Sequence, residues 1–451
     1  MIVDFTVKNF RSIKEEQTLS LLASASAKDK ESEKTIYSPN EPNIRLLRSS
    51  LIYGANASGK TNLLGSLSAF TYFIITSSDL KVGDRIPIYD PYRLDRNSPG
   101  EPIRFELEFI ADDNIRYRYS VECTQSEVIF EELLFYPNKQ EALLFLRVKG
   151  EPTKFGTQLK GKKRSINSIL LENQLFLSKA ANNNHEQLRE IYYFLKNNIR
   201  FHTKANSSDR HPSSFTTTKL WRDNQDPQTF KDQLVSLLLS SDFGISDIVL
   251  EIDPNIESKV TFPAFVPDEE KKQILEDLKA RPITYHKKYE GKEEIGTVRF
   301  ELAEESAGTI NMYEIGGKLI QTLRKGWTLI VDELDSSLHT MLSAHIISLF
   351  EDPKINVNGA QLIAATHDVS LLDPELLNRD QIWFTEKDKF GATELYSLDD
   401  FDKNQVRNDT NFGKWYLDGR FGALPLITPR LFSIKEENGK PKDAEIQETE
   451  T

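Results

Sequence analysis

The sequence predicts an α/β fold, in which a mixed β lobe and a parallel α/β core are separated by a mostly helical insertion. Three observations predict it. A strand-like run near residue 50 leads through a Gly- and Ser-containing loop into a helix-like run. Strand-like and helix-like runs return after about residue 295, and two apolar strand-like runs there end directly in polar residues. Between these parts, apolar residues recur mainly at helical spacing.

Changes in pattern along the chain give the expected domain boundaries. Residues 1–150 form the first lobe, with strand-like runs at 2–10, 103–110, 115–123, 128–136 and 142–148. Residues 151–294 form the helical insertion, with helix-like runs within 169–199, 230–239 and 268–279. Residues 295–430 form the second lobe, with strand-like runs at 296–303, 327–331, 361–365, 381–385 and 393–397. The last segment, 431–451, is rich in Lys and Glu and is expected to be a disordered tail.

Composition restricts the class of protein. The 451 residues leave room for two or three domains, and an apolar content of 38% is enough for packed cores. A net charge of −12 argues weakly against general nucleic-acid binding. The single cysteine, Cys123, cannot form an internal disulfide, which fits a reducing compartment. With no signal-peptide pattern and no apolar run long enough to span a bilayer, we expect a soluble, cytoplasmic protein without membrane partners.

The strongest motif is the G-x-x-x-x-G-K-[ST] pattern at residues 54–61, which lies between a strand-like and a helix-like run. Glycines allow the backbone to wrap around phosphates, and the loop N–H groups then point at the phosphate oxygens. Lys60 is expected to reach the β- and γ-phosphates, and the Thr61 hydroxyl to hold Mg²⁺. The predicted ATP-binding residues here are Gly54, Asn56, Ala57, Ser58, Gly59, Lys60, Thr61 and Asn62. The alternative is a Gly- and Ser-containing turn before a helix.

Two further strand ends carry the groups that such a loop needs. The apolar run 328–331 ends in Asp332 and Glu333. Asp332 is expected to order Mg²⁺ through water, and Glu333 to polarise the attacking water as a general base. The alternative is a buried strand that reaches solvent at an acidic turn. His367 follows the apolar run 361–365, where an imidazole can hydrogen-bond the γ-phosphate or the water, although a single histidine is more often structural.

Ser306 and Gly308 lie at the expected start of a helix, about two dozen residues before Asp332. A serine and a glycine there offer a hydroxyl, free N–H groups and the positive end of the helix dipole. Taken alone, an ordinary helix N-cap is the better interpretation. The position between a strand and the carboxylate strand favours a functional role.

Taken in order, these motifs resemble the heads of ABC-class ATPases. The segments 9–12, 54–61, 332–339 and 416–425 look like those of stand-alone AAA/ABC-type ATPases of bacterial phage defence (abortive infection). That group includes RloA-like proteins and the ATPase subunit of PARIS systems, and it is related to OLD and SMC-type heads. The resemblance covers the two lobes, about two thirds of the chain, and is weak in the middle.

The resemblance implies a head-to-head dimer or higher homo-oligomer that sandwiches ATP and Mg²⁺. Ser306 and Gly308 would then cap the γ-phosphate held by the loop of a partner, Asp335 would lie at the dimer seam, and Arg11 would lie near the nucleotide. Two features depart from the pattern. The signature is Ser-Ala-Gly-Thr, and no Gln can be assigned to the magnesium-sensing position, although residues 87–92 lie roughly where it belongs.

The function predicted from these motifs is ATP hydrolysis that opens and closes the dimer and gates a separate effector. OLD nucleases carry a nuclease domain after the ATPase, but only about fifty residues follow the last strand-like run here. We therefore expect a separate nuclease-type effector and a phage protein or DNA as the trigger. The alternatives are an SMC-like DNA-repair ATPase, a transporter ATPase subunit and a binding module that has lost hydrolysis.

Overall fold

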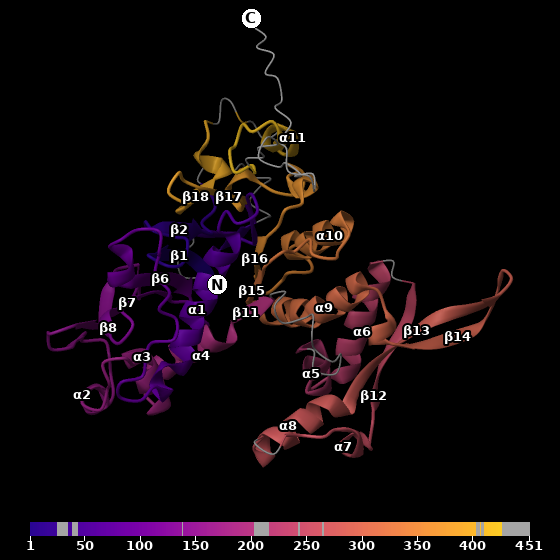
Figure 1. Ribbon diagram of the computed structural model, residues 1–451, viewed down its shortest axis with the longest axis horizontal. Coiled ribbons are helices and arrows are strands. Elements are labelled where there is room, and N and C mark those ends of the chain that lie inside the picture. Colours follow the sequence, from indigo (N-terminus) through magenta and orange to yellow (C-terminus); the bar gives the residue numbers. More distant parts are fainter. Residues whose placement is uncertain are drawn as a thin grey trace, which may run out of the picture.

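The computed structural model describes residues 1–24, 35–37, 44–137, 139–202, 216–241, 244–263, 266–402, 406 and 410–425. The predicted tail at 431–451 lies outside these residues. Figure 1 shows a β-rich lobe, a central α/β core and a two-stranded arm that extends away from both. The molecule is mixed α/β, as the sequence predicts.

The β-rich lobe is built on a seven-stranded sheet with the order β10-β9-β8-β7-β6-β1-β2, in which neighbouring strands are antiparallel. Alternate residues of β6 are buried, so one face of this sheet packs on the interior. The strands are β1 (Ile2–Lys8), β2 (Gln17–Ser20), β6 (Ile103–Ile110), β7 (Arg116–Cys123), β8 (Val128–Phe135), β9 (Ala142–Val148) and β10 (Lys154–Phe155).

The core is a six-stranded sheet with the order β11-β15-β16-β5-β17-β18. Its first five strands are parallel, and β18 runs antiparallel to β17. The strands are β5 (Ser49–Tyr53), β11 (Ile199–His202), β15 (Thr328–Val331), β16 (Gln361–Ala365), β17 (Ile382–Lys387) and β18 (Thr393–Ser397). Strands β5, β15 and β16 are buried along their whole length, and their sequences consist mostly of apolar or small residues.

Helices cover both faces of the core sheet. Ile52, Ile330 and Ile363 belong to one hydrophobic cluster, which also holds α1 (Lys60–Thr76), α3 (Phe176–Asn182) and α4 (Glu186–Asn197). Their chain neighbours Leu51, Leu329 and Leu362 belong to a second cluster with α6, α9 and α10. Those helices span Pro227–Ser240, Ala307–Lys325 and Thr340–Glu351. This alternation holds α1 on one face and α9 and α10 on the other, with the loops between them at one edge.

The segment 151–294 divides between two bodies, which corrects the picture of one helical insertion. Helices α3 and α4 pack with α1 in the first lobe, and β11 joins the core sheet beside β15. The rest includes a three-stranded antiparallel sheet of β12 (Ile245–Ile252), β13 (Ala280–Glu290) and β14 (Glu293–Glu301). The sequence pattern places the run 296–303 in the second lobe. The strand found there is β14, and among the described residues it pairs only with β13. The first point follows from the long-range pairing of β11 with β15, and the second from the hairpin that β14 forms with β13.

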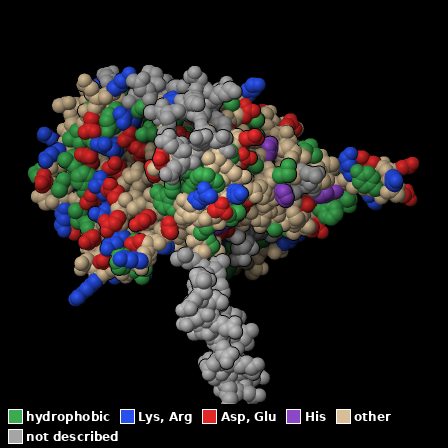
Figure 2. Space-filling view, turned by 90° about the horizontal axis from the view of Figure 1, so that it is seen from above, with side chains coloured by type: hydrophobic (Ala, Val, Ile, Leu, Met, Phe, Trp, Pro, Cys, Tyr) green, Lys and Arg blue, Asp and Glu red, His purple; other side chains and the backbone are tan. Residues whose placement is uncertain are grey.

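The hairpin of β13 and β14, which we call the arm, reaches away from the core (Figure 1). Figure 2 shows it protruding at the right, with charged side chains at its tip. The remaining helices and strands are β3 (Thr35–Tyr37), β4 (Arg45–Leu47), α2 (Lys163–Asn167), α5 (Thr216–Arg222), α7 (Ile256–Lys259), α8 (Asp268–Lys279) and α11 (Phe412–Leu417). Within the described part of the chain, no helix combines the length and apolar character needed to cross a membrane.

Candidate functional site

The segment 54–61, which carries the predicted phosphate-loop motif, joins β5 to α1. Gly54 and Gly59 have φ angles of 152° and 117°, which side chains rarely adopt. A Cβ on Gly54 would lie 2.4 Å from the Thr385 carbonyl oxygen, and one on Gly59 would lie 2.2 Å from Thr393 Oγ1. Two separate reasons therefore require glycine at both positions: the backbone φ angles, and the close approach of β17 and β18, which leaves no room for a side chain.

Lys60 begins α1 and folds over the loop. Its Nζ donates hydrogen bonds to the carbonyl oxygens of Gly54 (2.7 Å) and Ala55 (3.1 Å). The residue is only 6% exposed, and burial lowers its pKa to about 8, against the opposing effect of Asp332. A cation that is already largely desolvated at a helix N-terminus is suited to bind phosphate oxygens.

A chain of hydroxyl groups fixes the outer side of the loop. Asn62 Nδ2 donates to Ser12 Oγ (2.7 Å), which lies 2.8 Å from Thr393 Oγ1. Thr393 Oγ1 in turn donates to the Ser58 carbonyl oxygen (2.8 Å), and Ser58 Oγ lies 2.6 Å from Thr385 Oγ1. The sequence prediction did not include Thr385 or Thr393. Their only sequence signal is a threonine in each of the last two strand-like runs, which is too common to point to a site.

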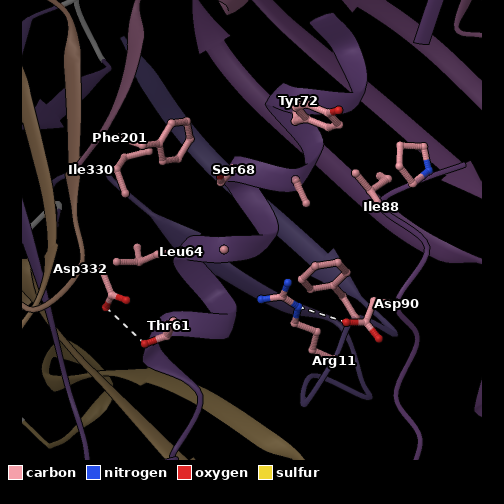
Figure 3. A pocket seen from close by; sticks show the side chains of 14 residues that line it. Arg11, Thr61, Leu64, Ser68, Tyr72, Ile88, Asp90, Phe201, Ile330 and Asp332 are labelled. Atoms are coloured by element: carbon pink, nitrogen blue, oxygen red, sulfur yellow. Dashed lines mark hydrogen bonds and ion pairs between the residues drawn. The ribbon is translucent and has the colours of Figure 1, made fainter. Parts of the chain in front are cut away.

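Asp332 lies directly beyond β15 and meets the start of α1. Thr61 Oγ1 donates to Asp332 Oδ1 at 3.3 Å, although the two residues are 271 positions apart (Figure 3). Burial raises the pKa of Asp332. A hydroxyl and a carboxylate are oxygen ligands that fit Mg²⁺, which takes few protein ligands and completes its shell with water and substrate phosphates. Among the described residues, no cluster of three or more His, Cys, Asp or Glu side chains offers a metal cage.

Glu333 is held in an uncommon backbone conformation. Its φ angle is 55°, in the left-handed region that non-glycine residues seldom occupy. The next residue, Leu334, donates its N–H to the Ala365 carbonyl oxygen (2.9 Å), and Ser336 N–H bonds back to the Glu333 carbonyl oxygen (2.9 Å). Such strain is typical of functional sites, where the surrounding structure enforces it.

His367 follows β16 and is positioned by Asp335. Asp335 Oδ1 accepts hydrogen bonds from Thr366 Oγ1 (2.8 Å) and from the His367 N–H (3.2 Å). Burial and, secondarily, the charge of Lys60 lower the pKa of His367, so the neutral imidazole is favoured. Within this protomer, Asp335 therefore braces the His367 turn. The predicted place of Asp335 at a dimer seam stays a prediction.

Arg11 lines a cavity of about 510 Å³ that also includes Thr61 and Asp332 (Figure 3). The Nε atom of Arg11 lies 3.2 Å from Asp90 Oδ2, and the backbone N–H of Arg11 donates to the Asp90 carbonyl oxygen (2.7 Å). Segment 87–92, expected to hold the magnesium-sensing position, contributes Pro87, Ile88 and Asp90 to the same cavity. It contains no Gln, and Asp90 is its only carboxylate.

Ser306 and Gly308 lie at the N-terminus of α9, apart from the residues that line this cavity. Ser306 is exposed, and its Oγ caps the helix by accepting from the Thr309 N–H (3.1 Å). The preceding residue, Glu305, is bound to the arm: its Oε1 contacts Thr284 Oγ1 and lies 2.7 Å from His286 Nε2. The turn 305–309, which we call the signature turn, is therefore tied to β13.

A second contact joins α9 to the carboxylate strand. Asn311 Nδ2 donates to the Ser336 carbonyl oxygen (2.7 Å), and Asn311 Oδ1 lies 3.2 Å from His202 Nε2. The His202 carbonyl oxygen accepts from the Asp332 N–H (3.0 Å). Neither His202 nor Asn311 was predicted from the sequence, because their roles depend on β11 pairing with β15.

The comparison with protein families identifies the chain. The model described as "AAA domain, putative AbiEii toxin, Type IV TA system" matches residues 49–373, well over half of the chain. The protein therefore belongs to this AAA domain family. The match begins at β5 and ends just after the His367 turn, so it includes the phosphate-binding loop and both strand ends. No curated protein sequence matches the chain significantly.

Solved structures give remote similarities. An Smc head bound to the C-winged helix domain of ScpA has 12% identity and a TM-score of 0.41, covering 88% of this chain and 97% of that chain. An Smc head with an extended coiled coil, bound to the C-terminal domain of ScpA derived from Pyrococcus furiosus, has 11% identity and a TM-score of 0.39, with coverage of 88% and 96%. The ATP-bound recombination mediator RecF has 14% identity and a TM-score of 0.33, with coverage of 88% and 97%. We base no functional inference on them.

Proposed function

We propose that the protein binds ATP with Mg²⁺ and hydrolyses it. The observation that carries this is the contact between Thr61 Oγ1 and Asp332 Oδ1 at 3.3 Å. This contact joins Thr61, the residue after Lys60, to Asp332, the carboxylate that follows β15. When bound, Mg²⁺ supplies charge that neutralises the phosphate oxygens and orients them. Thr61 and Asp332 would hold it.

The other site residues are proposed to bind the phosphates and to activate the attacking water. Lys60 and the loop N–H groups bind the β- and γ-phosphates. Glu333 accepts a proton from the attacking water, and its enforced backbone conformation fixes the direction of its side chain. His367 in its neutral form donates or accepts a hydrogen bond at the γ-phosphate end. Arg11, once released from Asp90, adds a positive charge beside the phosphates.

The proposed active unit is a homodimer, or a higher homo-oligomer, in which each signature turn meets nucleotide held by a partner. Ser306 is exposed at a helix N-terminus, so its hydroxyl and the N–H of Gly308 are accessible to a γ-phosphate. Within one protomer, this turn does not line the cavity that contains Thr61 and Asp332. ATP would close the dimer, and hydrolysis would open it.

The cycle is proposed to gate a separate effector in defence against phage. The family description, which names a putative toxin and a toxin–antitoxin system, supports this direction. The purified protein by itself should therefore leave plasmid and tRNA intact in the presence of Mg²⁺. Degradation of either substrate that persists in Lys60→Ala would contradict the need for an effector.

The test of the ATPase cycle uses Glu333→Gln. Removing the general base should lower kcat by about 100-fold or more while leaving ATP affinity within about twofold. Light scattering should show the variant's mass doubling, or rising further, only with MgATP. Glu375, which is exposed and outside the site, offers a matched control as Glu375→Gln. If Glu333→Gln hydrolysed ATP as fast as the wild type, Glu333 could not be the general base. If its mass did not change with MgATP, the proposal that ATP drives assembly would be wrong.

A further inference from the structure

A second cavity lies beside the first and has a different chemical character. Its volume is about 500 Å³, and it lies between α1, the end of α4, β11, α5 and α9. Ser68, Tyr72 and Phe201 line both cavities, so the two are contiguous. Figure 3 shows Tyr72 and Phe201 at the end of the first cavity that is remote from Thr61. We call the second space the lateral cavity.

Three cationic side chains line the lateral cavity, Lys196, Arg200 and Lys318. In a chain with a net charge of −12, such a concentration of positive charge needs an explanation. Lys318 is partly neutralised, because its Nζ lies 3.6 Å from Glu314 Oε1 and 3.3 Å from His202 Nδ1. No ion pair is found for Lys196 or Arg200 among the described residues.

Arg200 is the most informative of the three. Its guanidinium lies over the Trp327 ring at 4.4 Å from the centroid, and its Nε is buried without a hydrogen-bond partner. Burial lowers the pKa of Arg200. Arg200 is partly buried, and a partly desolvated guanidinium without an anion carries a cost, because buried polar atoms in native structures are nearly always satisfied. An anionic ligand would remove this cost, and planar guanidinium groups bind phosphate oxygens well.

The aromatic residues indicate what carries the phosphate. Tyr72 is 53% exposed, and both Tyr72 and Phe201 line the boundary of the two cavities. Aromatic faces of this kind stack nucleic-acid bases. A volume of about 500 Å³ lies within the usual range for small-ligand sites of roughly 300–1,000 Å³, and it cannot admit a duplex.

We propose that the lateral cavity is a binding site for a nucleoside monophosphate, separate from the ATP site. Arg200 and Lys196 bind the phosphate, and Tyr72 and Phe201 contact the base. This ligand lacks the β- and γ-phosphates that Lys60 would bind, so its binding should not depend on Lys60. Through Phe201 and the adjacent His202, the ligand would lie next to the strand that pairs with β15.

The test is calorimetric titration with AMP, CMP, GMP and UMP, each in turn, on Lys60→Ala protein. This variant removes binding that depends on the phosphate loop, and the assay requires no ATP turnover. At least one monophosphate should bind saturably at one per chain. Arg200→Gln and Lys196→Gln should each weaken it about tenfold, as expected for loss of one charge-assisted hydrogen bond. Lys8→Gln, which removes an exposed lysine of the β lobe, should not.

Two further measurements separate a binding role from a structural one. Arg200→Lys should retain part of the affinity, and the melting temperature without ligand should be similar in Lys196→Gln and wild type. The corresponding unphosphorylated nucleoside should bind at least about tenfold more weakly. The proposal fails if no monophosphate binds at millimolar concentration, if binding seen in wild type is lost in Lys60→Ala, or if Arg200→Gln and Lys196→Gln bind as wild type does. Binding of single-stranded DNA without binding of any monophosphate would also overturn it.

Discussion

The phosphate-binding loop and the signature turn are held in opposite ways. The loop between β5 and α1 is buried at both of its ends and is braced by β17, β18 and the turn after β1. The signature turn is exposed; Ser306 caps its own helix, and Glu305 is tied to a protruding arm. One half of the candidate site is therefore fixed by the core, whereas the position of the other half depends on an element that extends into solvent. Changes in the core should alter nucleotide binding, and changes at the arm should alter assembly.

The largest effect is expected at Lys60. Lys60→Ala removes the buried cation that would bind the β- and γ-phosphates, and ATP affinity should fall by at least about 100-fold. Equilibrium binding of a fluorescent ATP analogue in Mg²⁺ measures it. Lys81→Ala, in an exposed loop, is the matched control. Near-native affinity in Lys60→Ala would show that the phosphates lie elsewhere.

The next effect concerns the core beside the loop, where the stability of the protein should depend on pH through His202. Burial lowers the pKa of His202 to about 4 from the ordinary 6.5. The unfolded chain takes up a proton below pH 6.5 that the folded chain refuses until about pH 4, so the free energy of unfolding falls as pH drops through this range. The loss assigned to His202 should be about 2 to 3 kcal/mol, measured by urea unfolding at pH 7 and pH 4. His202→Gln should lose less over the same interval, and an equal loss would exclude His202 as the cause.

A smaller effect is expected from the hydroxyl chain behind the loop. Thr393→Val keeps the shape of the side chain that approaches Gly59, but it removes the hydrogen bond to Ser58. ATP affinity should fall about tenfold, because the loop loses one fixed point. Thr297→Val, on the exposed arm, makes the same chemical change away from the core. Equal affinities for Thr393→Val and wild type would mean that the chain of hydroxyls does not shape the loop.

The smallest effect tests the arm. Glu305→Gln weakens the charge-assisted contact with His286 and should leave ATP affinity unchanged. Association driven by ATP, measured by light scattering in the Glu333→Gln background, should weaken about threefold. Glu293→Gln, an exposed carboxylate at the start of β14, is the control. If Glu305→Gln reduced ATP binding as strongly as Thr393→Val, the division between core and arm would be wrong.

Local pattern was enough to find many elements. The predicted runs at 103–110, 142–148, 361–365 and 393–397 coincide with β6, β9, β16 and β18. Apolar periodicity and short polar interruptions specify such strands without reference to the rest of the chain. The phosphate-loop motif also lies between a strand and a helix, as expected, because its glycines and lysine need that context.

The choice of strand partners could not be predicted in the same way. Strand β14 has the alternation of an ordinary strand, and only its partner β13 assigns it to the arm instead of the core. Strand β11 is four residues long, yet its pairing with β15 connects His202 to Asp332. Side-chain pattern predicts that a segment is a strand, but the choice of neighbour depends on the packing of the whole sheet.

The sequence by itself determined the residues of the phosphate loop, the carboxylates after β15 and the order of the motifs, because each is encoded in a short stretch with its own chemistry. Only the tertiary structure decided which residues support them. Thr385 and Thr393 brace the loop from β17 and β18, and Glu305 binds the arm, through contacts between residues far apart in the chain. The proposed role of Arg200 follows only from a cavity that is lined by residues of five separate elements. The physical reason is that a hydrogen bond or a cavity depends on positions in space, which folding sets and local sequence does not.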